Sequence, residues 1–178
     1  MNDEMNLVIL SSPLAVGTQI QWQYMNYFNH VPQISDDTEE RNEERAEKLA
    51  NLFLLDGTLL FNGMIYKSRT AIKALYVSLS TDEYHNGQRR YCRRIVFSEP
   101  MHTRCEFYPT ARIIHQVVGR WQRIYDSENT MAIEERQRPH IFVIAGQRIA
   151  QDPHIISWQG IRQLIIGEPF QTQFLLVP

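Results

Sequence analysis

The second half of the chain reads as a series of long extended segments, and this feature restricts the fold more than any other. Runs rich in β-branched and aromatic residues are separated by short groups that contain Pro, Asp and Asn, which is typical of strands joined by turns. The predicted strands cover residues 91–98, 111–124, 140–150 and 154–166. We expect this half to form a long antiparallel meander.

The first half has the apolar spacing of helices, with residues of one kind recurring three or four positions apart. Asn62 and Gly63 stand between two short apolar runs, a combination that favours a tight hairpin turn. The predicted elements are a helix over 18–31 that ends before Pro32, a helix that begins at the candidate caps Asp36, Asp37 and Thr38, strands 58–61 and 64–66, and a helix over 70–79 capped at Ser68.

Helices in one half and strands in the other predict an α+β fold, in which the helices pack on one face of a bent antiparallel sheet. The length of 178 residues is that of a single domain, so we expect one domain over 1–178. Within it, we distinguish an N-terminal segment (1–17), a long loop (125–139) and a C-terminal extension (167–178).

Composition narrows the classes of function. The net charge of -2 argues against bulk attraction to nucleic acid or to a membrane surface. Cys92 and Cys105 lack metal-ligand or framework spacing, which favours reduced thiols in an intracellular protein. No segment has the length of a membrane span or the pattern of a signal peptide. The scattered histidines predict neither a metal site nor a cofactor.

The predicted strand over 111–124 is apolar on both of its faces, whereas a sheet covered on one side alternates apolar and polar residues. Because the helices cover one face, we expect the other face to contact a partner protein. The odd-numbered positions, on one face, include Ile113, His115, Val117 and Trp121. The even-numbered positions, on the other face, include Ile114, Val118 and Arg120. Trp121, Val118 and Arg120 are accordingly candidate partner contacts.

Four segments between Leu49 and Ile166 resemble a known family in their order and spacing. They are LANLFLLDGTLLFNGMIYKSRTAIKALYVSLSTDEY, IVFSEPMH, ARIIHQVVGRW and RPHIFVIAGQRIAQDPHIISWQGIRQLI. Together they are similar to the small subunit of the mRNA export receptor, in the family of nuclear transport factor 2-related export proteins. The loop over 125–139 is longer than in the animal proteins and is closer to the fungal subunits.

The resemblance implies a nuclear transport factor 2-like cone and a non-catalytic role. The chain would form a heterodimer, through its sheet face, with the corresponding domain of the larger export receptor subunit. The pair would carry mRNA–protein particles through nuclear pores, with phenylalanine-glycine nucleoporins bound mainly by the larger subunit. It would shuttle between nucleus, nuclear pore and cytoplasm.

Arg162 is the residue on which the partner hypothesis depends most. By strand alternation it shares a face with Trp158, Leu164 and Ile166, where a guanidinium requires a carboxylate partner. That carboxylate belongs either to this chain or, as the resemblance implies, to the larger subunit across the interface. These four residues complete the predicted partner-binding set.

A cluster of arginines around Tyr91 is the strongest signal for nucleic acid. Such a cluster can bind phosphates and stack a base, but alternate arginines also protect an edge strand from aggregation. The possible RNA contacts are Arg89, Arg90, Arg93 and Arg94.

Two other classes of function remain open. A homodimeric import factor for a small GTPase would need an acid-lined aromatic pocket, for which Asp126 and Glu128 are candidates. An enzyme of the polyketide-cyclase or dehydratase kind would need a base such as His115, near a tyrosine such as Tyr24, Tyr27 or Tyr66. No nucleophile, phosphate-loop or zinc-helix motif is present, so the sequence predicts no enzyme activity.

Overall fold

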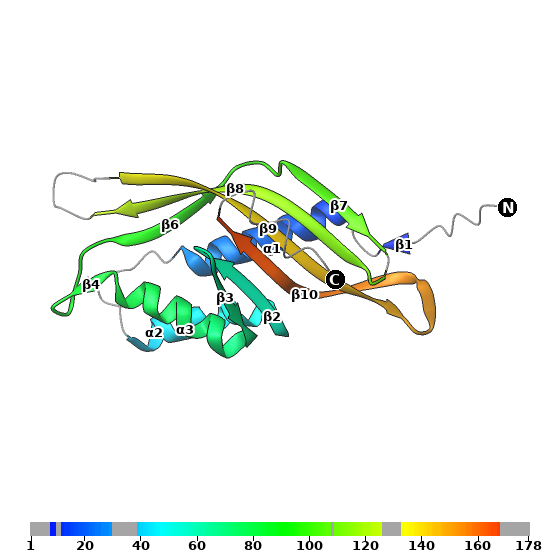
Figure 1. The fold of residues 1–178 in the computed structure, drawn as a ribbon, viewed down its shortest axis with the longest axis horizontal. Helices are drawn as coiled ribbons and strands as arrows, with labels where there is room; N and C mark the ends of the chain where they lie inside the picture. Colours follow the sequence, from blue (N-terminus) through cyan, green and yellow to red (C-terminus); the bar gives the residue numbers. More distant parts are fainter. Residues whose placement is uncertain (1–7, 10–11, 30–38, 108, 126–132, 168–178) are drawn as a thin grey trace.

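The computed structural model describes residues 8–9, 12–29, 39–107, 109–125 and 133–167 (Figure 1). In this part of the chain, helices pack against a large mixed sheet with the strand order β3-β2-β10-β9-β8-β6, to which β1 and β7 are added. The elements are β1 (Val8–Ile9), α1 (Pro13–Phe28), α2 (Glu39–Asn51), β2 (Phe53–Phe61), β3 (Met64–Lys67), α3 (Ser68–Thr81), β4 (Tyr84–His85), β5 (Gln88–Arg89), β6 (Cys92–Phe97), β7 (His102–Glu106), β8 (Arg112–Ile124), β9 (Ile133–Ile149) and β10 (Asp152–Ile166).

Helix α1 begins earlier than its apolar spacing predicts. Ser12 is the N-cap, its hydroxyl accepts a hydrogen bond from the Ala15 N–H at 3.1 Å, and Pro13 occupies the first turn. The helix ends at Asn29, whose side chain donates to the Ile95 carbonyl at 2.6 Å and accepts from the Ile95 N–H at 2.7 Å. Residues 13–17 therefore belong to α1, and Asn29 connects its end to β6.

The predicted hairpin is confirmed, and β2 is longer than predicted. Asn62 and Gly63 have φ values of 52° and 78°, as a two-residue turn between twisted strands requires. Strand β2 begins at Phe53 and pairs with β10 in parallel, so the hairpin continues the main sheet. The predicted cap Ser68 is the first residue of α3, and its hydroxyl accepts from the Ala71 N–H at 3.4 Å.

The predicted loop over 125–139 is wrong in its second part. Residues 133–139 belong to β9 and pair with β8 as far as Ile133 opposite Ile124, and residues 126–132 lie outside the described ranges. The charged sequence after Ile133 suggested a loop, but on a strand every second side chain points to solvent, as the Gln122–Glu135 hydrogen bond of 2.9 Å illustrates. Strand β7, with the polar sequence HTRCE, was missed for the same reason.

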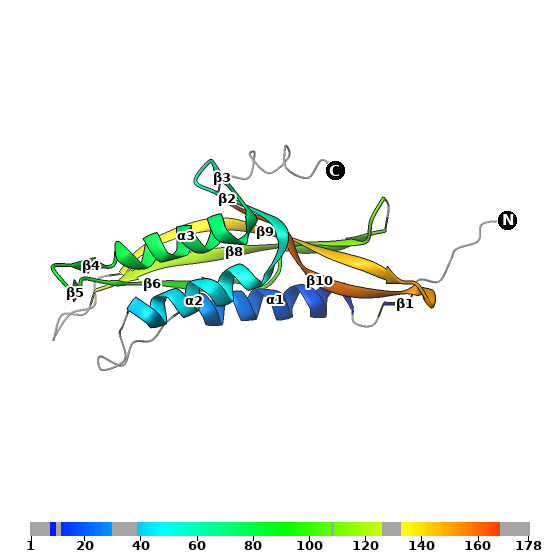
Figure 2. The ribbon, with the colours of Figure 1, turned by 90° about the horizontal axis from the view of Figure 1, so that it is seen from below.

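The main core lies between the helices and the inner face of the sheet. Figure 2 shows α1 running lengthwise beside the sheet, with α2 next to it. Buried side chains from all three helices, including Tyr24, Leu49 and Ile72, contact strand residues such as Ile113 and Phe142. None of the helices in the described ranges has the length and apolarity needed to cross a membrane.

Candidate functional site

The inner face of the sheet changes from apolar residues to arginine at one end of the cone. The arginines lie toward the same end of three adjacent strands, where antiparallel pairing places Arg93 opposite Arg123, and they extend further along β9, where Arg136 lies opposite Trp121 and Arg138 opposite Gly119. The inner-face series are Ile95 and Arg93 on β6, Val117, Trp121 and Arg123 on β8, and Phe142, His140, Arg138 and Arg136 on β9.

These arginines line a cavity of about 290 Å³, which we call the arginine pocket. The C-terminal end of α3 and the β2–β3 turn form its other walls. Of the described residues that line the pocket, Asp82 is the one that carries a carboxylate. The pocket is lined by Phe61, Asn62, Leu79, Asp82, Arg93, Trp121, Gln122, Arg123, Arg136 and Arg138. Its electrostatic character is therefore positive.

Arg138 is held against the aromatic floor of the arginine pocket. Its guanidinium lies 5.1 Å from the ring centre of Trp121 and 5.5 Å from that of Phe61, and it donates a hydrogen bond to the Asn62 side chain. Burial lowers the pKa of Arg138, and the charges of Arg136, Arg123 and Arg93 lower it further. The site thus holds a cation in surroundings that disfavour positive charge.

Arg93 separates the arginine pocket from a smaller cavity deeper in the cone. Its side chain is 11% exposed, donates to the Leu79 carbonyl, and donates to the Tyr91 hydroxyl at 3.2 Å. The Asp82 carboxylate lies 3.9 Å from its Nη2. These contacts fix the guanidinium between α3 and β6.

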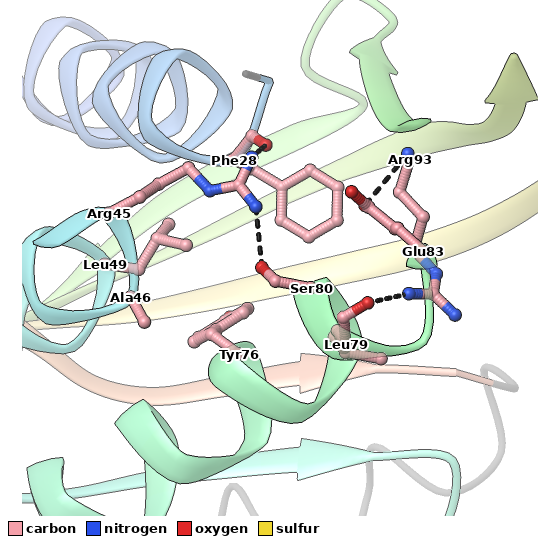
Figure 3. Close-up of a pocket in the computed structure, with 9 residues that line it drawn as sticks. All are labelled: Phe28, Arg45, Ala46, Leu49, Tyr76, Leu79, Ser80, Glu83 and Arg93. Atoms are coloured by element: carbon pink, nitrogen blue, oxygen red, sulfur yellow. Dashed lines mark hydrogen bonds between the residues drawn. The ribbon is translucent and has the colours of Figure 1, made fainter. Parts of the chain in front are cut away.

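The smaller cavity has a volume of about 10 Å³, which is room for one water molecule. Figure 3 shows Arg45 from α2 reaching Ser80 and the Phe28 carbonyl, at 2.6 and 3.4 Å. On the other side, the buried Glu83 carboxylate accepts from the Arg93 N–H at 3.1 Å. This cavity is too small for a substrate, and the hydrogen bonds at its edge support the wall of the arginine pocket.

Deeper in the cone, polar groups are buried and bonded to each other. The Tyr24 and Tyr76 hydroxyls are 2.5 Å apart, and burial raises the pKa of both. His140 Nε2 accepts from the Trp121 indole N–H at 3.3 Å, while its Nδ1–H donates to the Arg138 carbonyl at 2.8 Å. Burial lowers the pKa of His140 to about 4, so the ring is neutral near pH 7.

His115, the base considered for an enzyme, has a structural environment. Its two ring nitrogens lie 2.8 Å from Gln21 Oε1 and 2.8 Å from the Thr103 hydroxyl. The side chain is 0% exposed, and burial lowers its pKa to about 4. Both nitrogens have partners and neither reaches the arginine pocket, so His115 positions α1 on the sheet.

Arg162 pairs with a carboxylate of its own chain, which was one of the two predicted alternatives, but its predicted apolar surroundings are wrong. Its Nη1 lies 3.4 Å from the Asp56 carboxylate of the same chain, and the two side chains are 48% and 76% exposed. Register shifts in β10 around Gly160 and Ile161 break the simple alternation. As a result Arg162 points to solvent, while Leu164 points inward.

The other predicted partner contacts do not share one surface. Trp121, Leu164 and Ile166 are buried in the inner core, and Trp158 is partly buried against it. Trp121 lies on the inner face of β8, opposite to the face that carries Val118 and Arg120. Val118 is half-buried and Arg120 is exposed on the outer side of β8.

The arginines proposed to contact RNA are also divided. Arg93 points into the cone, whereas Arg94, the next residue on β6, is exposed on the other face. Arg90 is exposed and lies 5.9 Å from the Tyr91 ring centre. Arg89 belongs to β5, and its side chain lies outside the described part.

Sequence reasoning missed Arg123, Arg136 and Arg138, which complete the arginine pocket. Side-chain alternation along the strand could have identified Arg123, because it lies on the same face of β8 as Val117 and Trp121. Arg136 and Arg138 fall in the predicted loop over 125–139, and a loop prediction assigns no residue to a face of the sheet. The acids proposed for a GTPase pocket, Asp126 and Glu128, lie outside the described residues.

No protein-family model matches this chain, and no curated protein is detectably similar to it. Several solved structures are similar over most of its length. Aln2 from a Streptomyces species has a TM-score of 0.57 and 12% identity, over 94% of this chain and 99% of that chain. ActVI-ORFA from Streptomyces coelicolor has a TM-score of 0.58 and 13% identity, over 88% and 97%.

A ketosteroid isomerase-like protein from Erwinia carotovora has a TM-score of 0.56 and 11% identity, over 90% of this chain and 98% of that chain. Such low identity shows the fold alone. The similarity lends no support to membership of the export-protein family. It also contradicts the prediction that the chain is not an enzyme, because a protein named for an enzyme class shares this fold, and we withdraw that prediction. The chain has an α+β, nuclear transport factor 2-like fold, as predicted.

Proposed function

We propose that this chain is an enzyme that binds a small organic anion in the arginine pocket. The observation that carries the proposal is the convergence of Arg93, Arg123, Arg136 and Arg138 on one cavity, against a single lining carboxylate among the described residues. Guanidinium groups recognise carboxylates and phosphates through paired N–H donors. The pocket is accordingly suited to an anionic group.

Electrostatic repulsion supports the same conclusion. Two unit charges of like sign at 6 Å repel by about 3 kcal/mol at an effective dielectric constant of about 20. In the free protein, water and salt screen this repulsion. A bound anion is attracted to each guanidinium, and this attraction offsets the repulsion between them.

The size of the pocket and the residues of its floor indicate what the rest of the ligand is like. A volume of about 290 Å³ is at the lower end of the range for small-molecule sites. The rings of Phe61 and Trp121 offer apolar faces beside the arginines. A molecule with one or two rings and an acidic group meets both conditions.

Asp82 gives the pocket a group that can accept a proton. In the proposed reaction, its carboxylate removes a proton from a carbon next to a carbonyl group. The electron pair of the C–H bond forms a carbon–carbon double bond, the π pair of the carbonyl moves to its oxygen, and guanidinium N–H groups stabilise the negative charge of the resulting enolate. A ketosteroid isomerase-like neighbour with the same fold is consistent with this class of chemistry.

Calorimetric titration with 2-naphthoate, and with its uncharged analogue 2-naphthamide, tests the binding step. We expect naphthoate to bind and naphthamide to bind much more weakly. Loss of one charge-assisted hydrogen bond costs about 1.5–3 kcal/mol, so Arg138→Met should weaken binding by roughly ten- to a hundredfold. Arg94→Met, on the opposite face of β6, is the matched control and should bind normally. Equal binding of the two probes, or no binding of either, would overturn the proposal.

Pairing with a larger export receptor, contact with nucleoporins or RNA, and a nuclear location remain predictions. The residues on which they depended lie on different faces, so ligand binding is the stronger proposal. Affinity purification followed by mass spectrometry would identify such a partner directly. Asp82→Asn separates the two roles, because it should abolish proton transfer and leave any pairing unchanged.

A further inference from the structure

A second apolar cluster lies on the outer face of the sheet, opposite the helices. It consists of Leu60, Ile114, Ile141, Val143 and Ile165, which we call the outer cluster. Each of these side chains is between 0% and 6% exposed. The outer cluster is therefore as well covered as the main core, although it occupies the other side of the strands.

Strand register makes the outer cluster continuous. Ile165 pairs with Ile141 on one side and with Leu60 on the other, and Val143 pairs with Ile114. Four strands thus contribute neighbouring side chains to one patch. An apolar patch of this extent is unfavourable in water and needs a cover.

The helices do not provide that cover. The buried apolar helix residues that the structure describes all belong to the main core on the inner face, and the outer cluster contains strand residues alone. The low exposure is a property of a single chain, so a partner is not needed to explain it. The cover has to come from another part of this chain.

The segment 168–178 starts where a cover is required. It follows Gly167, two residues after Ile165, and the Gly167 N–H donates to the Pro139 carbonyl on β9 at 3.3 Å. Gly167 has a φ of 151°, which other residues rarely adopt and which allows the chain to change direction. Gly167, the last described residue, therefore lies beside the outer cluster.

The composition and the length of the segment 168–178 are also suited to covering the outer cluster. The segment reads EPFQTQFLLVP, with a single charge at Glu168 and large apolar residues at Phe170, Phe174, Leu175 and Leu176. Extended chain covers about 3.3 Å per residue, whereas neighbouring strands lie about 4.8 Å apart. A few residues are enough to cross the patch.

We infer that residues 168–178 fold back over the outer sheet face and cover the outer cluster with their apolar side chains. This inference does not depend on the proposed ligand. The sequence predicts that this face contacts a partner protein, whereas the inference has it covered by the chain's own C-terminal segment. A second copy or a different protein on this face is the competing occupant.

Disulfide trapping in the full chain tests the inference. Gln163 pairs with Val143 on the outer side of β10 and accepts a cysteine without loss of core packing. Phe170→Cys or Phe174→Cys is combined with Gln163→Cys, in a chain in which Cys92 and Cys105 are replaced by alanine. A disulfide needs Cβ atoms within about 4.5 Å. We expect an intrachain bond in at least one combination, and none when Lys73→Cys on α3 replaces Gln163→Cys.

Dye binding provides a second, independent measurement. Phe170→Ser, Phe174→Ser and Leu176→Ser together should expose the outer cluster, and therefore increase binding of 8-anilinonaphthalene-1-sulfonate and promote self-association. The matched control changes Gln171, Thr172 and Gln173 to serine and should behave like the unchanged chain. Disulfides that form only between chains would assign the face to a second copy. Absence of any bond, or unchanged dye binding, would overturn the inference.

Discussion

Arg93 and Arg123 face each other directly across β6 and β8, so two positive charges form one cross-strand pair. Like charges in this position destabilise a sheet, by an amount comparable to the gain from an opposite pair. The Tyr91 ring lies 5.3 Å from the guanidinium carbon of Arg93 and 5.0 Å from that of Arg123, which offsets part of the repulsion. This pair is the clearest sign that the end of the cone is adapted to an anion.

We predict that anions stabilise the protein through this pair. A ligand at a hundred times its dissociation constant stabilises a fold by about 2.7 kcal/mol. The melting temperature should therefore rise with 2-naphthoate and rise less in Arg123→Gln. Thermal melts at constant ionic strength measure the effect, with sodium chloride as the reference salt. In the control Arg94→Gln, on the exposed face, we expect the same rise in melting temperature as in the unchanged chain. The same rise in Arg123→Gln would contradict the prediction.

Arg162→Ala should have a small effect on stability. Its ion pair with Asp56 is exposed, and exposed pairs contribute about 0.2–1 kcal/mol. Urea unfolding of Arg162→Ala, Asp56→Ala and the double variant measures the coupling between the two side chains. A loss above about 2 kcal/mol would instead indicate that the pair is desolvated in an assembly.

The buried His140 should make the protein less stable in mild acid. Burial and the Arg138 charge lower its pKa from 6.5 to about 4, against the raising effect of its hydrogen bond to the Arg138 carbonyl. Between these two values the unfolded chain takes up a proton that the native ring does not, so stability falls as the pH decreases through this window. Below the native pKa both states are protonated and the loss ends.

The expected loss from His140 is on the order of 3 kcal/mol, at about 1.4 kcal/mol per pKa unit. His140→Gln keeps an acceptor for Trp121 and should reduce the difference in unfolding free energy between pH 7 and pH 4.5. His154→Gln, at an exposed position, should leave that difference unchanged. Part of the pH dependence should remain in His140→Gln, because burial also lowers the pKa of His115 to about 4, whereas a pH dependence of unchanged size would contradict the role of His140.

Gly17→Ala should destabilise the protein although it lies within a helix. Helix propensity alone favours alanine by about 1 kcal/mol. A Cβ at this position would lie 2.4 Å from His115 Nδ1, in a ring held by Gln21 and Thr103. Overpacking of this kind costs about 1–3 kcal/mol. In a His115→Ser background the cost should shrink, which denaturant unfolding of the two variants would show.

Much of the fold was predictable from local patterns. The Asn62-Gly63 turn, the apolar spacing of α3 and the long strands β8 and β10 depend on residues close in sequence, and their physical causes act locally. The order of helices and strands was sufficient for the α+β class. The long charged stretch of β9 was not predictable in this way, because its strand form depends on pairing with β8.

The candidate site depended on tertiary structure. The sequence by itself placed arginine next in the inner series after Trp121, but only the pairing of β6, β8 and β9 brings Arg93, Arg123, Arg136 and Arg138 to the same end of the sheet and around one cavity. The face on which Arg162 lies was decided by register shifts in β10, since each added residue exchanges the two faces of a strand. Side-chain alternation is a local property that sequence determines, whereas register is set by the packing of whole strands against one another.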